Sequence, residues 1–589
     1  MKFGFQSQVK QNNSVGANRP GGQYNFDRGF TQPNPFATGS NLGNGIASFL
    51  LGDPSLGLIN LRALTAPQAP FYGWYFQDDY KVTPKLTLTF GLRYDLLLGV
   101  TERYNQSAIG FDKTASNPIE AAAKAAYAAN PIPELPAANF NVKGGILFAS
   151  PDNRRNVKTE TTDWQPRIGV AYRFLPRTVL RTGFGMFYSE WWQPFVNTTG
   201  FAAETDMTTT LDGGLTPADT LANPFPNGLV QPTGSSLGLT TLLGQTLSLY
   251  DYNRKNIRNY RWSFGFQHEI SRDLQVEVNY VGQHAVNLIT SSSSSDSGRV
   301  FNAGWNGTGG TFDQKYYSLG ARLNATIPNP FKGLIPQPSA LAGNTITVAQ
   351  LLMPFPEFGN ITYSRTMGGT SHYNSIQTGV NKRFSRGLQA QFAYTYSKQL
   401  ETLRYIEPSD STPSQMIGQF DNPHRVSTGI IYELPFGAGQ PLKSNVKAVN
   451  KVISGWQWST MYIYQTGAAV ALPAVLATGI SPSIDNANIN HRFNGDSMKV
   501  LPAFTARRIP FYWGDLRVPA INNWDMAFIK NTTLYRERMK LQFRFEMINA
   551  FNRVWFGGLQ TSVTAATYTQ LTSQANQPRN MQLGLKLTF

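Results

Sequence analysis

The feature that most constrains this 589-residue sequence is an alternation of apolar and other residues that recurs in short segments along the whole chain. In the carboxyl-terminal segment, Met581, Leu583, Leu585, Leu587 and Phe589 alternate with Gln582, Gly584, Lys586 and Thr588. Successive side chains of a β-strand point to opposite faces, so a period of two predicts strands with one apolar face. Two other clear segments place Leu86, Leu88 and Phe90, and Leu541, Phe543 and Phe545, on such a face.

The connections between these segments are sorted by length. Short turns are expected near residues 82–84, 175–177, 271–273, 385–387 and 535–538, and an intermediate connection at 436–454. Long polar stretches lie between them, at residues 98–163, 189–258, 285–370, 400–423, 468–520 and 553–578. Short periplasmic turns and longer extracellular loops are typical of outer-membrane barrels, whereas a soluble β-sandwich has no reason to sort its loops by end.

The sequence therefore predicts an all-β fold, a transmembrane antiparallel β-barrel of about 14–16 strands. The two optional strands are residues 23–30 and 56–64. We expect the strands to close, because an open strand edge is not tolerated in lipid, and we expect both termini on the periplasmic side. Trp and Tyr residues near the predicted strand ends suit the membrane–water boundary. They are Trp74, Tyr75, Trp191, Trp192, Trp262, Trp456, Trp458 and Trp524.

Composition excludes several other classes of protein. Charged residues make up only 15% of the chain, against about 25% in soluble domains. The longest apolar run, residues 468–477, is interrupted by Pro473 and is well short of the roughly 20 residues of a membrane-spanning helix. The net charge of +16 is dispersed rather than clustered, so we expect no nucleic-acid partner.

No pattern of catalytic or cofactor-binding residues is present. The five histidines, His268, His284, His372, His424 and His491, have no metal-binding spacing. Nucleophile-elbow and phosphate-loop motifs are also absent. We therefore expect a protein that is not an enzyme and that needs neither metal nor cofactor.

Alternation also assigns the charged strand residues to the inner side of the barrel. The candidates for the lumen are Arg93, Arg181, Glu277, Arg544, Glu546 and Lys586. The candidates for lipid contact on the other side are Leu86, Leu88, Phe90, Leu541, Phe543, Phe545 and Leu583. The inner charges either hydrate and brace the wall or contact a plug domain or a solute. Both interpretations stay open at this point.

Several segments resemble Oar-like TonB-dependent receptors. They include Tyr75-Phe-Gln-Asp-Asp-Tyr, Trp262-Ser-Phe-Gly-Phe-Gln-His-Glu, Tyr394-Thr-Tyr-Ser-Lys, Asp421-Asn-Pro-His-Arg and Phe543-Arg-Phe-Glu-Met-Ile-Asn-Ala-Phe-Asn. The resemblance implies a carboxypeptidase-regulatory-like domain, a plug and a barrel of about 22 strands. Residues 1–589 are then a partial outer-membrane β-barrel domain without the first two parts. Because an alternating strand replaces a signal peptide after Met1, we expect a chain truncated at its amino terminus.

The resemblance also implies a function and a set of partners. The chain is expected to supply the wall of an outer-membrane transporter or receptor for uptake or export of a large solute, with the TonB complex acting only through the missing plug. Outer-membrane lipid is a further partner. Phe589, with Leu587 and Leu585, resembles the signal that engages the outer-membrane assembly machinery. The alternative to a transporter is a passive porin-like or adhesive outer-membrane protein. A soluble β-rich carbohydrate-binding protein is a third hypothesis.

Overall fold

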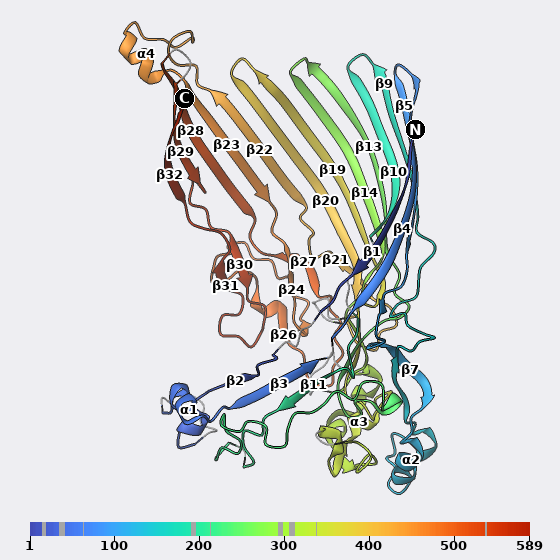
Figure 1. The fold of residues 1–589 in the computed structure, drawn as a ribbon. Helices are drawn as coiled ribbons and strands as arrows, with labels where there is room; N and C mark the ends of the chain where they lie inside the picture. Colours follow the sequence, from blue (N-terminus) through green and yellow to red (C-terminus); the bar gives the residue numbers. More distant parts are fainter. Residues whose placement is uncertain are drawn as a thin grey trace.

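The computed structural model describes residues 1–589 except 15–18, 35–41, 63, 190–195, 213, 293–297, 306–311, 337–338 and 536–538. Its main feature is a curved antiparallel sheet of 16 strands, of which β6 (Thr101–Glu102) and β21 (Ser414–Ile417) lie off the main path (Figure 1). The path runs in this order: β1 (Lys2–Gln11), β4 (Pro67–Thr83), β5 (Leu86–Leu97), β9 (Trp164–Leu175), β10 (Thr178–Ser189), β13 (Ile257–Ser271), β14 (Leu274–Ile289), β19 (Met367–Ser385), β20 (Leu388–Arg404), β22 (His424–Glu433), β23 (Trp456–Gln465), β28 (Ile521–Tyr535), β29 (Met539–Ile548) and β32 (Asn580–Thr588). We call this path the wall.

The connections of the wall are sorted by length as the sequence predicts. Short turns join β4 to β5, β9 to β10, β13 to β14 and β19 to β20 at one end, which we call the turn end (Figure 1). In the β19–β20 turn, Arg386 and Gly387 both have positive φ, 51° and 79°, a backbone form that matches the twist of paired strands. The intermediate connection at the same end carries α4 (Lys447–Ile453). The expected turn at 535–538 lies largely outside the described residues.

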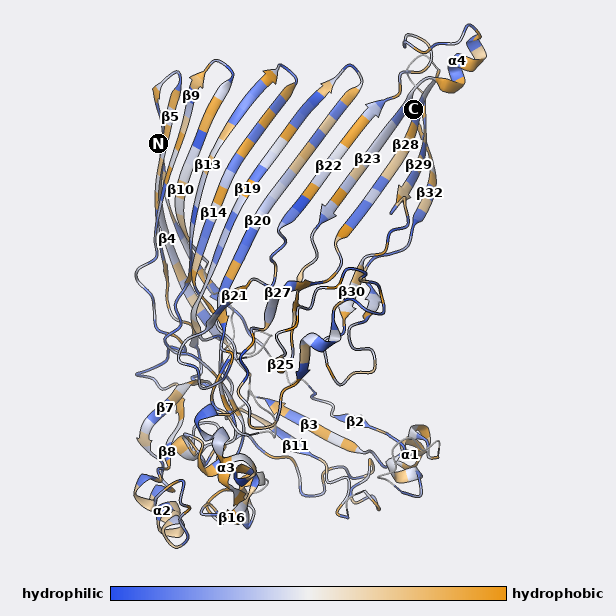
Figure 2. Ribbon diagram, turned by 180° about the vertical axis from the view of Figure 1, so that it is seen from behind, coloured by the Kyte–Doolittle hydropathy of each residue, from blue (hydrophilic) through white to orange (hydrophobic). Residues whose placement is uncertain are grey.

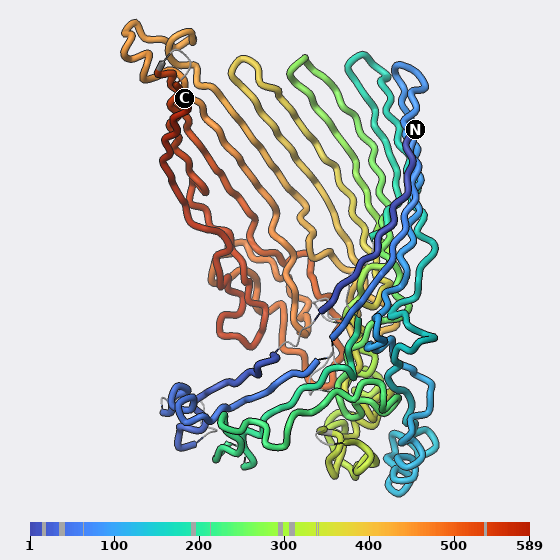
Figure 3. The backbone as a smooth tube through the Cα atoms, viewed as in Figure 1, coloured from blue at the N-terminus to red at the C-terminus, as the bar shows by residue number. Residues whose placement is uncertain are grey.

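All long connections leave the opposite end of the wall, the loop end, and both chain termini lie at the turn end (Figure 3). The expected common side of the two termini is therefore confirmed. No hydrogen-bonded pairing joins β1 to β32 among the described residues, so closure of the wall into a ring stays a prediction. None of the described helices is long and apolar enough to cross a membrane.

The two optional wall strands belong to a separate sheet. β2 (Gln23–Asn25) and β3 (Leu56–Arg62) pair with each other, and β3 also pairs with β11 (Ala202–Asp206). Both are shorter than the roughly 9–11 residues that a tilted membrane strand needs. Contrary to the prediction from the sequence, the two segments therefore do not extend the wall. They form a small separate sheet at the loop end (Figure 1).

The long loops are folded rather than irregular. Their small sheets pair β7 (Ala108–Ser116) with β8 (Lys143–Phe148), β12 (Leu247–Tyr250) and β15 (Arg299–Asn302) with β18 (Ile361–Ser364), β16 (Thr326–Pro328) with β17 (Thr345–Thr347), β24 (Ala469–Ala471) with β27 (Tyr512–Arg517), β25 (Val475–Ala477) with β26 (Met498–Val500), and β30 (Phe556–Leu559) with β31 (Leu571–Gln574). The helices at this end are α1 (Gly45–Leu51), α2 (Glu120–Ala128) and α3 (Val348–Leu351), with 3-10 turns η1 (Gly29–Thr31), η2 (Ala137–Asn139), η3 (Gly238–Thr240), η4 (Gln314–Asn324), η5 (Ala340–Ala342) and η6 (Gly495–Ser497).

Helix α2 forms in an alanine-rich segment of its loop. Alanine has the highest helix propensity, and Glu120 in the first turn lies 2.6 Å from the ammonium of Lys124, one turn further on. Ala123 and Tyr127 lie on the buried side. The Tyr127 hydroxyl donates a hydrogen bond to the Leu135 carbonyl at 2.6 Å and accepts one from the Ile132 amide, which fixes the chain that follows.

Three loops distant in sequence share one apolar core. Phe140 from residues 98–163, Leu247 from residues 189–258 and Phe331 from residues 285–370 are each at most 1% exposed and belong to one cluster. The Phe140 ring lies 4.2 Å from that of Tyr127 and 6.0 Å from that of Phe331. We call the described parts of these three loops the cap. Ala123 and Tyr127 of α2 belong to this cluster together with Val348, Ala349 and Leu351 of α3.

Candidate functional site: the polar face of the wall

The register of the strands places the charged and the apolar candidates on opposite faces of the wall. In β5, Arg93 pairs with Tyr75 and Gln165, and Leu92 pairs with Phe76 and Pro166. We call the face of Arg93 the polar face and the face of Leu92 the apolar face. Direct cross-strand partners share a face, so the pairing can be followed across the wall. It places Arg93, Arg181, Glu277, Arg544, Glu546 and Lys586 on the polar face, and Leu86, Leu88, Phe90, Leu541, Phe543, Phe545, Leu583, Leu585 and Leu587 on the apolar face.

The apolar face leaves large hydrophobic side chains open. Phe3 is 78% exposed, Leu583 73% and Leu585 71%. Figure 2 shows the alternation of apolar and polar positions along the strands. A contiguous apolar surface of this extent is uncommon on a soluble monomer. The surroundings that contact this face of the wall must therefore be apolar as well.

Aromatic rings form a row on the apolar face that reaches the loop end at Trp164, the first residue of β9. The ring of Trp74 lies 5.2 Å from Phe5 and 5.8 Å from Tyr94, and Tyr94 lies 4.4 Å from Trp164. Trp456 and Trp458 begin β23 at the turn end, and Trp524 lies near the start of β28 at the loop end. Three residues depart from the expected placement at strand ends. Trp74 and Tyr75 lie in the middle of β4, and Trp262 lies inside β13, where it packs over Gly282. Trp191 and Trp192 lie outside the described residues.

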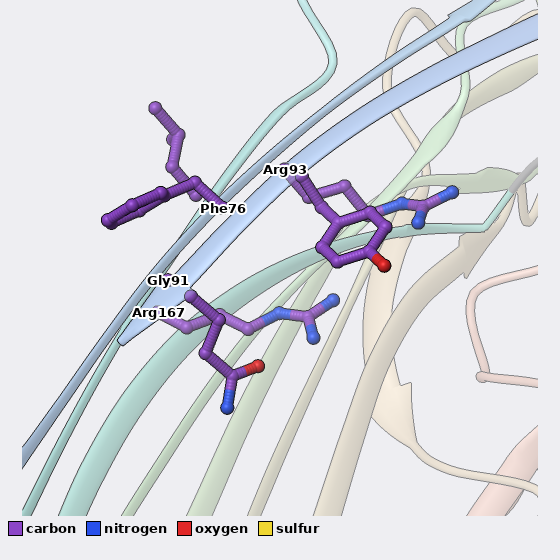
Figure 4. A pocket seen from close by; sticks show the side chains of 7 residues that line it. Phe76, Gly91, Arg93 and Arg167 are labelled. Atoms are coloured by element: carbon purple, nitrogen blue, oxygen red, sulfur yellow. The ribbon is translucent and has the colours of Figure 1, made fainter. Parts of the chain in front are cut away.

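Two arginines on adjacent strands frame a hollow in the polar face. Arg93 on β5 and Arg167 on β9 extend to one side of the strands and Phe76 to the other (Figure 4). Gly91, the cross-strand partner of Arg167, carries no side chain. The hollow beside these residues has a volume of about 310 Å³. Backbone pairing therefore holds two guanidinium groups toward the same side.

Hydrogen bonds and a shared ring orient the arginines. The Nε of Arg93 lies 2.8 Å from an Asp95 carboxylate oxygen, and the Gln165 amide donates to the same carboxylate at 2.5 Å. Arg167 stacks on the Phe187 ring at 4.6 Å. Arg261 stacks on that ring as well, at 5.6 Å, and guanidinium groups bind favourably over aromatic faces. These contacts restrict the side-chain motion of the arginines.

The arginines form an arc across four neighbouring strands of the polar face. Arg93, Arg167, Arg181 and Arg261 lie on β5, β9, β10 and β13, which are neighbours in the wall. Arg181 donates from Nε to the Gln267 side chain at 3.2 Å, and Glu277 on β14 follows at the edge of the arc. We call these four arginines the arginine arc. Elsewhere on the same face, Arg544 and Glu546 form an ion pair at 2.5 Å.

The sequence predictions found part of this arrangement. Arg93 and Arg181 belong to the arc, whereas Glu277, Arg544, Glu546 and Lys586 lie on strands beyond it. Sequence reasoning missed Arg167, Arg261 and Phe187. Alternation within residues 164–171 would have placed Arg167 on the same face as Gln165, but the shared ring of Phe187 needs the β9–β10–β13 register.

A buried carboxyl lies where the polar face meets the cap. Asp163, 1% exposed, directly precedes β9, and its carboxylate accepts a hydrogen bond from the Asn256 amide at 2.5 Å. Burial, with the negative charges of Glu160 and Asp95 nearby, raises the pKa of Asp163 to about 7, against the opposing effects of Asn256 and Arg258. The Asp163 backbone carbonyl accepts from the amide of Asp95 on β5 at 3.2 Å. This carboxyl therefore titrates near neutral pH at a junction of loops and wall.

The junction should loosen as the pH rises. Because the folded state holds the pKa of Asp163 above its ordinary value of 3.8, its protonated form stabilises the junction at low pH, and that stability is lost as pH rises from about 3.8 to about 7. We expect faster hydrogen exchange of the Asp95 backbone amide, which donates to the Asp163 carbonyl, at pH 8 than at pH 5, after correction for the intrinsic pH dependence of exchange.

The Asp163→Asn variant should remove this pH dependence, since asparagine does not titrate. Asp152, exposed in the same loop, provides the matched control, and Asp152→Asn should retain the wild-type change. An unaltered pH response in Asp163→Asn would contradict the assignment.

Together these features define a class of protein. An antiparallel wall with an exposed apolar face, a charged opposite face and loops sorted by end is the arrangement of a membrane-spanning β-barrel. The chain belongs to the outer membrane beta barrel domain family, whose model matches residues 1–582. It is therefore a protein of the cell outer membrane, with the turn end periplasmic and the loop end extracellular.

Comparison with solved structures finds outer-membrane transporters and receptors, at TM-scores of 0.39 or less. The unliganded ferric citrate transporter FecA is 9% identical, with a TM-score of 0.37, 94% of this chain covered and 48% of that chain. The transporter YddB from Escherichia coli is 10% identical, with a TM-score of 0.38 and coverage of 90% and 55%. The pyoverdine receptor FpvA from Pseudomonas aeruginosa is 11% identical, with a TM-score of 0.39 and coverage of 91% and 44%. The chain thus spans about half the length of these proteins. No curated protein sequence matches it.

Proposed function

We propose that this chain forms the membrane-spanning wall of a TonB-dependent outer-membrane transporter or receptor of the Oar-like type, which moves a large solute and catalyses no reaction. In this proposal the apolar face contacts lipid and the polar face lines the path of the solute. The TonB complex acts through a plug contributed by a longer polypeptide. The solute and the direction of its movement are left open.

The observation that carries the proposal is the arginine arc on the polar face. Four cations lie on neighbouring strands of the polar face, and two of them share the Phe187 ring, which restricts the motion of their side chains. Charged groups on a lumen wall tune its selectivity. An arc of fixed positive charge favours an anionic solute over a cationic one.

The cap favours a second candidate function. A folded extracellular unit with its own apolar core is also what an adhesive outer-membrane protein would present to a surface. A passive porin-like protein would use the same wall without energy coupling. The three functions differ in whether a solute is moved and whether its movement needs energy.

Depletion of solutes from the growth medium separates these functions. Cells that produce the natural full-length polypeptide, in a strain without general porins, are compared with cells that lack it, and mass spectrometry follows the medium with and without a protonophore. We expect depletion or release of at least one solute that depends on the protein and stops with the protonophore. Movement that persists with the protonophore indicates a porin. Surface adhesion without movement of any solute indicates an adhesin, and either result overturns the proposal.

The same assay tests the arginine arc. Arg167→Gln should lower the transport rate several-fold at unchanged protein content in the outer membrane. Arg173→Gln is the matched control, because Arg173 lies on the same strand at the turn end, where it contacts the Pro84 carbonyl. Equal rates in the two variants would remove the arc from the solute path.

The carboxyl terminus should direct assembly of the barrel. Phe589 follows β32 and is 95% exposed, and Leu587 and Leu585 continue its apolar face. We expect deletion of Phe589 to lower the amount of heat-resistant, membrane-inserted protein several-fold, because the assembly machinery would lose its terminal aromatic contact. Replacement by Tyr, which keeps the ring, should restore insertion. Unchanged insertion after the deletion would contradict this role.

A further inference from the structure

The cap contains a pocket that is separate from the polar face of the wall. Its volume is about 690 Å³, and strands β7, β15 and β18 line it together with the segment after β12. All three cap loops therefore contribute. Pockets of about 300–1,000 Å³ with apolar walls and a few placed polar groups are typical of small-molecule sites.

Aromatic rings hold a lysine at the pocket. The ammonium of Lys113 lies 4.3 Å from the centre of the Phe301 ring and 5.4 Å from that of Tyr363. Tyr363 is itself fixed, because its hydroxyl donates to the Phe111 carbonyl at 3.4 Å. Lys113 packs against these rings and keeps part of its surface exposed to solvent. Among the described residues no carboxylate oxygen lies within salt-bridge distance of its ammonium. The ammonium is thus positioned by rings and accessible to a ligand.

The surroundings of Lys113 carry an excess of positive charge. Arg299 also lines the pocket, with Asp251 as the acidic lining residue. The Nη2 of Arg299 donates to the Asp410 carbonyl at 2.9 Å, while its buried Nε has no hydrogen-bond partner. Partial burial and the charge of Arg299 lower the pKa of Lys113.

Two further arginines are next in sequence to residues that line the pocket: Arg254 follows Asn253, and Arg365 precedes Thr366. Arg254 and Arg365 both stack on the Tyr250 ring, at 5.4 and 5.3 Å. Arg254 is 9% exposed, and burial together with the charge of Arg365 lowers its pKa to about 10. Crowded cations destabilise one another, and a bound anion relieves that repulsion.

We propose that this pocket binds a small organic anion, with its carboxylate or phosphate on Lys113 and Arg299 and its apolar or aromatic body against Phe111, Phe301 and Leu147. The lining residues supply both parts of this recognition. That the bound anion is also the transported solute rests on the proposed function, whereas the binding itself does not.

Calorimetric titration of the full chain in detergent tests the binding directly. The probe is 2-naphthoate, which joins a carboxylate to an apolar ring system, and 2-naphthamide is its uncharged match. We expect 2-naphthoate to bind at least tenfold more tightly than 2-naphthamide. No binding of 2-naphthoate, or equal affinity for the two compounds, would overturn the proposal.

Variants locate the site. Lys113→Gln should weaken 2-naphthoate binding at least tenfold, and Lys113→Arg should keep most of it, since it restores the charge. Lys315→Gln is the matched control: Lys315 also lies over a ring in the cap, 4.7 Å from Tyr316, but outside the pocket. Protease resistance of the cap confirms that each variant is folded. Wild-type affinity in folded Lys113→Gln would overturn the site.

The two proposals fail separately. Loss of binding in Lys113→Gln with no change in protonophore-sensitive transport would detach the pocket from the transported solute. Intact binding in a protein that moves no solute would leave the pocket in place and overturn the transport function instead.

Discussion

Replacing Phe331 with alanine should destabilise the cap by about 3–5 kcal/mol, the cost of removing a fully buried phenylalanine. Phe331 is 0% exposed and packs on Phe140. Phe140 belongs to a different loop and packs in turn on Tyr127 of α2. The cavity left by the ring would therefore weaken contacts between loops as well as within one.

Hydrogen exchange measured by mass spectrometry reports this loss of cap stability. We expect faster exchange in residues 120–146 as well as in residues 326–348, with no change in the wall. Phe420→Ala is the matched control, because Phe420 lies in another loop and is 71% exposed; it should change neither segment. Faster exchange confined to residues 326–348 would show that the loops are ordered independently of one another.

Replacing Leu585 with arginine should lower the free energy of unfolding by about 2–4 kcal/mol, the cost of placing a guanidinium on the lipid face near the bilayer midplane. Leu585 lies on the apolar face opposite Phe543 and is 71% exposed. In water an exposed leucine would tolerate this change with little effect. The predicted cost therefore measures lipid contact rather than packing.

The neighbouring residue provides the matched control. Lys586 pairs with Gln542 on the polar face, and Lys586→Gln should be nearly silent in the same urea titration in lipid vesicles. Similar losses in both variants would contradict the assignment of the two faces. Insertion of each variant is checked by its resistance to extraction with alkali, so that an assembly defect is not mistaken for instability.

Local periodicity accounts for what the sequence predicted correctly. The strands that include Leu86–Phe90, Leu541–Phe545 and Leu583–Leu587, the sorting of their connections and the two faces follow from a period of two and from turn residues. Helix α2 follows from a local alanine-rich segment. Each of these signals lies within about ten neighbouring residues, so no knowledge of distant contacts is needed.

Features without a local signal could not be predicted. The Phe140–Phe331 contact, the Phe187 ring shared by Arg167 and Arg261, and the Lys113 pocket each join segments far apart in the chain. The position of β3 outside the wall was also not predicted, because its alternating sequence does not reveal that its partners are β2 and β11. The long loops carry no sequence periodicity from which such contacts could be predicted.

The sequence by itself determined the strands of the wall and their two faces, because a period of two places apolar and polar side chains on opposite sides of each strand. Only the tertiary structure decided that the long loops fold into a cap with one core, and which cations gather in the arginine arc and around the pocket. Those arrangements depend on strand register and on packing between distant loops, which are set by the whole fold rather than by any one segment.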